Sequence, residues 1–424
     1  MADAVTQWND VLLDVIRLQT ETRAAPGPIA RAGAMMHGAI YDAVNSIRPS
    51  THRPYLVSVP ASPGTSVRAA IAHAAHDTLV AAFPSNAALI TSKRDAAIAA
   101  LPQTPNVPRG EVVGKAAAAA TIAARTGDGA DDMTPYVHET EPGSWRPTDR
   151  TPAATPNWGG VKPFGIPGGN AFRPPRPGGY ASKTEMLMSS EYAAQFNEVK
   201  TLGKVDALAT GHRMAEQEEI AFFWANDLDG TYKPPGQLFD ITKVVSDQKG
   251  LGIVENARLF ALVSFAMADA GIVAWDAKFD TSLDLWRPET AIMEASTATN
   301  PATEPDMGWR PLSRKAPPDT TTFSPPFPAY VSGHATFGAA HAAIMRRFFG
   351  TDNVTFTAST DDPNLPSGVT RTFNSFTAAA LENARSRVYL GVHFQWDGDH
   401  GFQSGTALAE HIYDNVLKPV GAGS

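Results

Sequence analysis

Apolar residues recur at helical spacing along most of this chain, and this periodicity predicts an all-α fold. In the first part of the chain the pattern runs through 8–18, 30–44, 67–80 and 112–124. In the second part it runs through 207–224, 255–275, 329–349, 373–389 and 402–416. Pro, Gly, Ser or Asn punctuates these stretches, as it usually does between helices, and no alternating strand pattern of any length is evident.

The segment 134–180 breaks the helical pattern because Pro and Gly dominate it. It also holds four bulky aromatic residues: Trp145, Trp158, Phe164 and Phe172. A disordered linker would not need them, so we expect an ordered loop that packs over a core and covers part of an active-site entrance. The 424 residues are then one unit in three parts: a helical bundle over about 1–130, a covering loop over 131–185 and a second bundle over 186–424.

Charge and composition exclude several classes of function. The formal net charge of -8, without a basic run, argues against nucleic acid as a partner. The apolar run 259–268 lies between Arg258 and Asp269, so we expect a soluble protein with no membrane partner. With no cysteine, the chemistry must come from His, Ser, Lys, Arg and carboxylates. The N-terminus lacks a basic segment followed by an apolar core, and we favour an exported protein without its signal peptide over a cytoplasmic one.

The strongest local motif begins at Phe327 and reads Phe-Pro-Ala-Tyr-Val-Ser-Gly-His, followed by a helical run. Ser332 stands where an N-cap is expected, so the backbone N–H groups of Gly333 and His334 lie at a helix start, where the helix dipole favours an anion. The alternative is a cap beside an ordinary buried histidine, which for Ser-Gly-His alone would hold about nine times in ten. The motif therefore needs partners.

A second motif supplies them over 386–397. Gly391 can end one helix, which puts Arg387 on its last turn and His393 near the start of the next. Asp397 then lies one turn further along and can accept a hydrogen bond that fixes the imidazole tautomer. Such an imidazole can attack phosphorus or coordinate the metal centre of an oxyanion. The alternative for Arg387 is a surface ion pair with Glu382.

A third motif pairs Trp275-Asp-Ala-Lys278 with Trp286-Arg287-Pro288. Isolated lysines and arginines are usually solvated surface charges, but here they offer the positive charge and donors that a tetrahedral oxyanion requires. Two arginines, one lysine, a serine and a helix N-terminus could satisfy four oxyanion oxygens, and two histidines would add acid–base and ligand or nucleophile chemistry. The three motifs together therefore predict an oxyanion site.

Together these motifs resemble the Lys…Arg-Pro, Ser-Gly-His and Ser-Arg…His…Asp pattern shared by vanadium-dependent haloperoxidases and type 2 phosphatidic-acid phosphatases. The segments 34–44, 145–148 and 158–164 are similar to parts of soluble bacterial vanadium haloperoxidases, so the resemblance covers most of the chain. It implies an all-α fold of two four-helix bundles, with the anion site in the C-terminal half and vanadate, or phosphate in its absence, as the bound anion.

The resemblance also implies roles for individual residues. His393 matches the axial vanadium ligand, and His334 matches the acid–base histidine. The residues that match those hydrogen-bonded to the equatorial oxygens are Lys278, Arg287, Ser332, Gly333 and Arg387. Around them, Asp227 matches an acidic partner of the second arginine, Trp275 supplies an apolar lining, and Phe327 matches a position linked to chloride versus bromide preference.

Two departures from the family pattern matter. Eight residues separate Lys278 from Arg287, where the family has six, and on one unbroken helix these side chains would lie on opposite faces. The chain from Asp280 must therefore kink if Lys278 is to reach the site. In addition, Val331 replaces the usual proline before Ser-Gly-His, which should loosen the loop without changing the chemistry.

The function predicted from the resemblance is oxidation of bromide, with chloride as a second candidate halide, by hydrogen peroxide to a hypohalous acid equivalent that halogenates a small organic substrate. Lys278, His334 and His393 would be the catalytic residues. Three alternatives stay open: an acid phosphatase with a phosphohistidine intermediate, a silent oxyanion-binding homologue, and a metal-dependent hydrolase built on His393, Asp397, Asp399 and His400. Alanine-rich helices leave room for a homodimer interface without identifying one.

Overall fold

The computed structural model describes residues 3–48, 51–149, 151–296 and 298–421. It confirms the all-α prediction, with 56% of the chain in helices. The helices are α1 (Ala4–Ile16), α2 (Pro26–Ile47), α3 (Val67–Ala82), α4 (Ala87–Ala99), α5 (Asn106–Arg125), α6 (Lys183–Met188), α7 (Ser190–Leu202), α8 (Ala215–Phe223), α9 (Lys233–Lys249), α10 (Ile253–Phe279), α11 (Pro288–Met293), α12 (Gly333–Phe349), α13 (Phe376–Tyr389) and α14 (Gln395–Asn415).

Five helices (α4, α6, α7, α9 and α11) and a hairpin were not predicted from the sequence. Among them, α4 buries only Ile90 and so shows no apolar stripe. Helix α9 opens with Lys-Pro-Pro-Gly, which resembles a turn although proline is favourable in a first helical turn. Helices α6 and α7 lie directly after the Pro/Gly-rich segment. The antiparallel strands β1 (Phe356–Ser359) and β2 (Thr370–Phe373) have only four residues each, too few for a clear alternation.

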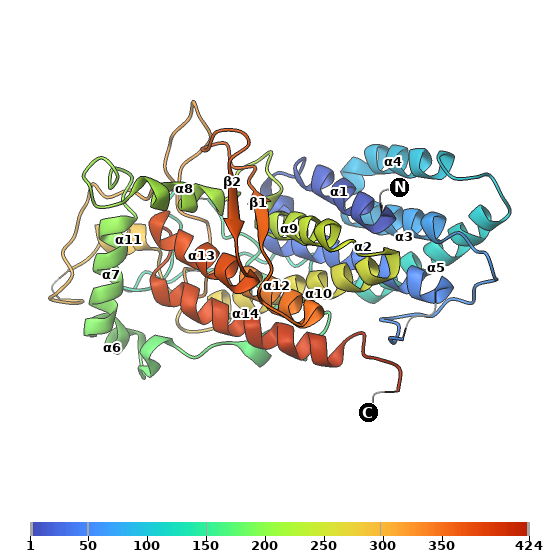
Figure 1. The fold of residues 1–424 in the computed structure, drawn as a ribbon. Helices are drawn as coiled ribbons and strands as arrows, with labels where there is room; N and C mark the ends of the chain where they lie inside the picture. The colour runs from blue at the N-terminus through green and yellow to red at the C-terminus, as the bar shows by residue number, and fades with distance from the viewer. Residues whose placement is uncertain (1–2, 49–50, 150, 297, 422–424) are drawn as a thin grey trace.

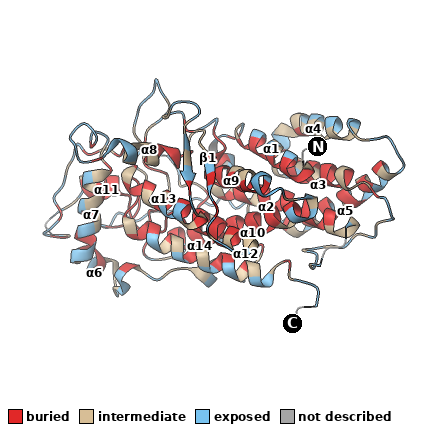
Figure 2. Ribbon diagram, in the orientation of Figure 1, coloured by how far each residue is buried: buried red, intermediate tan, exposed pale blue. Residues whose placement is uncertain are grey.

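Helix α10 lies at the centre of the molecule and joins its two ends. Figure 1 shows α1–α5 gathered at one end of an elongated molecule, with α6, α7, α8 and α11 at the other. Helix α10 packs against α2 from the first group and against α12 and α14, which lie between the ends. From Leu259 to Phe279 every residue of α10 is buried (Figure 2). The central helix therefore carries its C-terminal turn, with Lys278, into the interior.

The length of α10 corrects one expectation from the sequence. Arg258 and Asp269 were expected to interrupt the apolar run, but the helix continues through both over 27 residues. By length and composition alone it could cross a membrane, yet 94% of its apolar window is buried inside the protein. It is therefore a core helix in this structure.

A buried carboxylate fixes the covering loop to α10. Asp269 accepts hydrogen bonds from the backbone N–H groups of Phe164 (2.7 Å), Gly165 (2.7 Å) and Ile166 (3.0 Å). Burial raises the pKa of Asp269 to about 6, although the three N–H groups oppose this shift. Arg173 adds an ion pair with Asp276 on the same helix. As predicted, the loop packs on a core, and it does so through α10.

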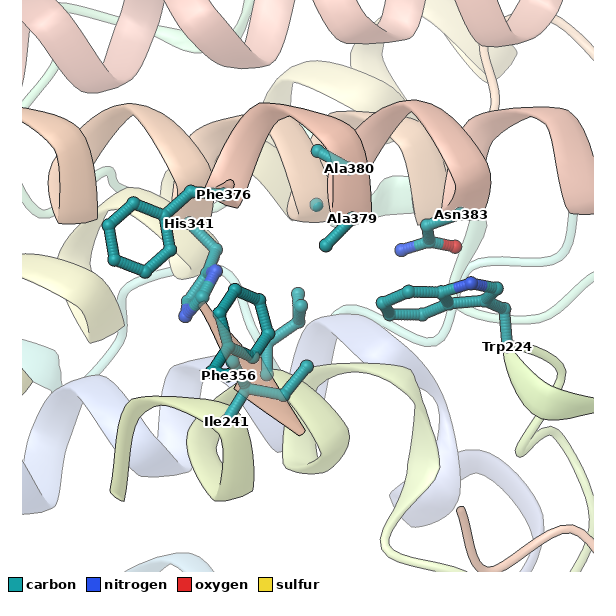
Figure 3. Close-up of a pocket in the computed structure, with 10 residues that line it drawn as sticks. Trp224, Ile241, His341, Phe356, Phe376, Ala379, Ala380 and Asn383 are labelled. Atoms are coloured by element: carbon teal, nitrogen blue, oxygen red, sulfur yellow. The ribbon is translucent and has the colours of Figure 1, made fainter. Parts of the chain in front are cut away.

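A small internal cavity lies between α9, α12 and α13. Its volume is about 10 Å³, close to the space of one water molecule, and its walls include Trp224, His341 and Asn383 (Figure 3). The Nε2 atom of His341 lies 3.1 Å from the hydroxyl of Thr242. Burial lowers the pKa of His341 to about 3, so this imidazole is neutral in the folded protein near neutral pH.

Asp269→Asn should destabilise the protein, because an amide nitrogen cannot accept the backbone N–H groups that the carboxylate holds. We expect a loss of about 2–4 kcal/mol in the free energy of unfolding, measured with urea. Asp247→Asn is the control, since Asp247 is an exposed carboxylate paired with Lys243, and it should cost less than about 0.5 kcal/mol. Equal losses in the two variants would contradict the account of the loop anchor.

His341→Gln should remove a pH-dependent part of the stability. The folded pKa of about 3 lies below the ordinary value of 6.5, so neutral His341 favours folding fully above pH 6.5 and progressively less as pH falls toward 3. Between pH 7 and pH 5 the wild type should lose about 2 kcal/mol more than the variant. Urea unfolding at the two pH values measures this, and a difference independent of pH would refute it.

Candidate functional site

The first turn of α12 forms one wall of the candidate site. Ser332 is its N-cap, fully buried, and its hydroxyl accepts a hydrogen bond from the Ala335 N–H at 3.4 Å. The Ser332 N–H donates to the carbonyl of Asp397 at 2.9 Å, which ties this helix start to α14. The first N–H groups of a helix have no helical acceptor, and here they begin at Gly333. The predicted cap is confirmed, and it presents donors at the positive end of a helix.

His393 lies directly before α14 and is oriented by Asp397, as the spacing predicts. Its Nδ1 is 3.0 Å from Asp397 Oδ2, which also accepts from the Phe394 N–H at 3.0 Å. The carboxylate accepts, so Nδ1 carries the proton and Nε2 keeps its lone pair. Burial and the nearby Arg287 hold the pKa of His393 well below its usual range. Burial raises the pKa of Asp397 to about 7, against the opposing charge of Lys278.

Gly391 makes this arrangement possible. It follows the end of α13 with a φ of 79°, and a Cβ there would lie 2.3 Å from the carbonyl of Gly203. Only glycine combines that conformation with such close backbone contact. The predicted end of the helix is therefore confirmed, and it turns the chain so that His393 faces Arg287.

Arg287 is the N-cap of α11 and is fully buried. Its Nε donates to the carbonyl of Phe327 at 2.7 Å, and its Nη1 donates to the carbonyl of Val392 at 2.7 Å and lies 3.0 Å from His393 Nε2. Among the described residues, its Nη2 has no partner. Burial lowers the pKa of Arg287 to about 9, which leaves it charged at neutral pH.

Arg387 occupies the last turn of α13 and is 1% exposed. Its Nη2 donates to Asp227 Oδ2 at 3.0 Å, while its Nε and Nη1 find no partner in the described parts of the chain. The alternative surface pair with Glu382 is wrong, because Glu382 accepts from Arg371 at 2.8 and 2.9 Å instead. Burial lowers the pKa of Arg387, and Asp227 opposes the shift.

Lys278 reaches the cluster despite the longer spacing. Helix α10 ends at Phe279, and the chain bends before Arg287, as the spacing required. The ammonium donates to the carbonyls of Pro328 (2.6 Å) and Ala329 (3.1 Å) and lies 5.1 Å from the centre of the Phe327 ring. An ammonium has three donors, so one remains. Burial and the charge of Arg287 hold the pKa of Lys278 well below its usual range.

His334 lies beside Asp227, on the same side of the site as Arg387. Its Nε2 is 3.1 Å from the carbonyl of Ala225, which can only accept, so Nε2 carries the proton and Nδ1 is the basic nitrogen. Asp227 Oδ1 lies 4.0 Å from the same Nε2. Burial, then the charge of Arg387, lowers the pKa of His334 to about 4. Ala225 could not be identified from the sequence, because it contacts His334 through its backbone carbonyl, a group that every residue has.

Unpartnered donors show what this cluster can hold. Within this cluster, three buried guanidinium nitrogens have no partner among the described residues: Nη2 of Arg287 and Nε and Nη1 of Arg387. The charges of Arg287, Lys278 and Arg387 all lower the pKa of His393, so all three cations lie near that imidazole. Buried donors are rarely left unpaired. Their number, charge and forked geometry fit a tetrahedral oxyanion such as vanadate or phosphate, with His393 Nε2 beside it.

An open cavity borders the site. Its volume is about 240 Å³, and Asp227 and Phe327 connect it to the charged cluster. The Phe327 ring packs on Trp275, with ring centres 4.9 Å apart. The other lining residues come from five segments: Ala24, Ala25, Pro26, Ala154, Asp229, Lys233, Pro234, Phe323, Pro325 and Pro326. Ala154 belongs to the covering loop, which therefore borders the entrance.

The structure does not support the metal-dependent hydrolase. No group of three or more His, Cys, Asp or Glu residues gathers as a metal site in the part of the chain that is described. Asp399 accepts a hydrogen bond from Gln395 at 2.6 Å, and His400 Nδ1 lies 2.7 Å from the hydroxyl of Tyr330. Both residues are thus engaged away from His393.

Comparisons with known proteins agree with this geometry. Residues 258–422 match the family model described as VCPO second helical-bundle domain. Over 258 residues the chain is 30% identical to vanadium chloroperoxidase from Curvularia inaequalis, a match that covers 49% of this chain and 41% of that protein, so the chain spans less than half of that relative. The comparisons confirm the resemblance to vanadium-dependent haloperoxidases.

Solved structures share the whole fold. A bacterial vanadium-dependent iodoperoxidase superposes with a TM-score of 0.80 at 23% identity, covering 98% of each chain. A bacterial vanadium-dependent chloroperoxidase in its holo form superposes with a TM-score of 0.70 at 18% identity, covering 93% of this chain and 94% of the other. The predicted haloperoxidase-like arrangement of helical bundles is therefore confirmed as the fold.

Arg387→Gln should weaken oxyanion binding at the cluster. The change removes a buried charge with two free donors, and such a loss costs about 2 kcal/mol or more, or about 30-fold in affinity. Isothermal titration with orthovanadate or inorganic phosphate at neutral pH measures it. Arg371→Gln is the control, because Arg371 pairs with Glu219 and Glu382 outside the cluster. An unchanged affinity in Arg387→Gln would show that the anion binds elsewhere.

Proposed function

We propose that this chain is a vanadium-dependent haloperoxidase, which oxidises halide with hydrogen peroxide. The observation that carries the proposal is the set of unpartnered guanidinium nitrogens of Arg287 and Arg387 near His393, whose unprotonated Nε2 lies 3.0 Å from Arg287 Nη1. The fold similarity to an iodoperoxidase over 98% of both chains supports the same reading. Bound vanadate would supply a Lewis-acidic centre that activates peroxide toward a halide ion.

Each residue of the cluster has a proposed task. Arg287, Arg387 and Lys278 hold the oxyanion by charge and hydrogen bonds, together with the first N–H groups of α12 and the Ser332 hydroxyl. His393 offers Nε2 as the metal ligand, and Asp397 keeps the imidazole in the tautomer that allows this. These tasks follow from the free atoms that each side chain presents.

His334 is the proposed acid–base residue. Its Nε2–H is committed to the Ala225 carbonyl, so Nδ1 is the nitrogen that accepts a proton from hydrogen peroxide. A pKa of about 4 keeps this nitrogen unprotonated near neutral pH. Lys278, with one donor left, would polarise the oxygen that the halide attacks.

The residues beside the cluster favour a small anion that can lose its hydration shell. Phe327 and Trp275 form an apolar contact beside Lys278 and Arg287, and a halide loses hydration most readily next to such a surface. We propose bromide as a substrate. We propose chloride as well, because Phe327 matches the position that the family resemblance links to chloride versus bromide preference. The product is a hypohalous acid equivalent that halogenates a small organic molecule reaching the opening. A homodimer stays a prediction.

A second candidate function uses the same atoms. The unprotonated Nε2 of His393 is also the nucleophile that a phosphohistidine intermediate needs, and phosphate shares the tetrahedral shape of vanadate. In that reaction His334 would protonate the leaving group. The two reactions differ in what they consume, so a single set of assays separates them.

Purified protein should oxidise bromide with hydrogen peroxide only after orthovanadate is added, and His393→Ala should abolish this activity. His212→Ala is the control, because His212 is exposed and its imidazole has Thr210 as its one hydrogen-bond partner among the described residues. Chloride, iodide and a phosphate monoester are tested on the same preparation, with a halogen-acceptor dye as the readout for the halides. Phosphate release that vanadate inhibits, without halide oxidation, would assign the protein to the phosphatases instead.

A further inference from the structure

One loop, residues 225–227, contacts both His334 and Arg387 in the site. The carbonyl of Ala225 accepts from His334, and the carboxylate of Asp227 accepts from Arg387 at 3.0 Å. The residue between them is Asn226, which is fully buried. The relative placement of His334 and Arg387 therefore depends on the backbone conformation at Asn226.

Asn226 adopts an uncommon conformation. Its φ is 45°, in the left-handed region, where asparagine is tolerated better than most residues with a side chain. This turn points the Ala225 carbonyl toward His334 and the Asp227 carboxylate toward Arg387. A residue that preferred the ordinary helical or extended region would separate the two contacts.

The side chain of Asn226 is fully occupied in holding that turn. Its Nδ2 donates to the carbonyl of Phe223 at 3.2 Å and to Gln237 Oε1 at 3.1 Å. Its Oδ1 accepts from the hydroxyl of Thr360 at 3.2 Å and from the N–H of Asp361 at 3.0 Å. The network thus joins the end of α8, the first turns of α9 and the chain that follows β1.

The backbone of Asn226 is held as well. Its N–H donates to Asp362 Oδ2 at 3.2 Å, and its carbonyl accepts from the hydroxyl of Thr231 at 2.7 Å. Asp362 is 4% exposed and is itself fixed by the N–H of Asn364 at 3.0 Å. A residue whose side chain and backbone are both fully bonded in a buried network has little freedom to shift.

We propose that Asn226 is a positioning residue for the oxyanion site, acting through Ala225 on His334 and through Asp227 on Arg387. The hairpin β1–β2 then has a function, since the segment that leaves β1 supplies the partners of the Asn226 side chain. The inference rests on the proposed anion site but not on the reaction that follows binding.

The test is Asn226→Gly in the full chain, because glycine keeps the left-handed conformation and removes the four side-chain hydrogen bonds. Orthovanadate affinity, measured by isothermal titration without peroxide or halide, should fall about 10-fold or more, as is usual for partners that orient a ligand residue. Asn300→Gly is the matched control. Asn300 is 2% exposed and bonds the carbonyls of Leu187 and Ser189, away from the cluster.

Both variants should unfold at a lower temperature, but only Asn226→Gly should lose affinity. If Asn226→Gly does not fold, Thr360→Val removes two bonds of the network, from the Thr360 hydroxyl to Asn226 Oδ1 and from the Asp362 N–H to that hydroxyl, and should lower the affinity about 3-fold. The effects of Asn226→Gly and Arg387→Gln should also be non-additive, since both act on one contact. Wild-type affinity in the folded variant, or an equal loss in Asn300→Gly, would overturn the proposal. A wild type that binds neither vanadate nor phosphate would overturn the proposed function as well.

Discussion

The buried positive charge around His393 is the constraint on which the rest of this structure depends. Lys278, Arg287 and Arg387 are removed from water, and the carboxylates near them are Asp227 and Asp397. Desolvated charge is costly unless it is paired. Burial lowers the pKa of all three cations, because the charged form of each side chain loses its hydration. A bound anion would satisfy the unpartnered donors of Arg287 and Arg387.

The fold meets this constraint by bringing helix ends together. Lys278 comes from the end of α10, Arg387 from the end of α13, Arg287 from the start of α11, and the Ser332 cap opens α12. Helix ends leave backbone groups unpaired and give the chain freedom to turn, so side chains from four helices, three of them charged, can meet at one place. The covering loop, anchored by Asp269, then borders the opening while the cluster stays buried.

Much of the site could be predicted because it depends on contacts between residues that are close in sequence. The Ser332 cap and the His393–Asp397 contact each depend on residues within one turn. The position of Lys278 was harder to predict, because its side chain enters the site only if the chain bends after Phe279. The spacing to Arg287 showed that a bend was needed, but not where or how the chain would bend. The hairpin could not be predicted because its strands have only four residues each. The Asn226 network could not be predicted, since Thr360 and Asp361 lie more than 130 residues from Asn226 in sequence. Isolated polar residues in short segments carry no periodicity that would reveal such contacts.

The most direct test of the central claim is a crystal structure of the protein soaked with orthovanadate. The account predicts vanadium bonded to Nε2 of His393, with its oxygens hydrogen-bonded to Arg287, Arg387 and the first N–H groups of α12. Vanadium bound at any other place, or an anion held without contact to His393, would contradict it. The same crystals would show whether Ala225 and Asp227 keep their contacts when the anion is present.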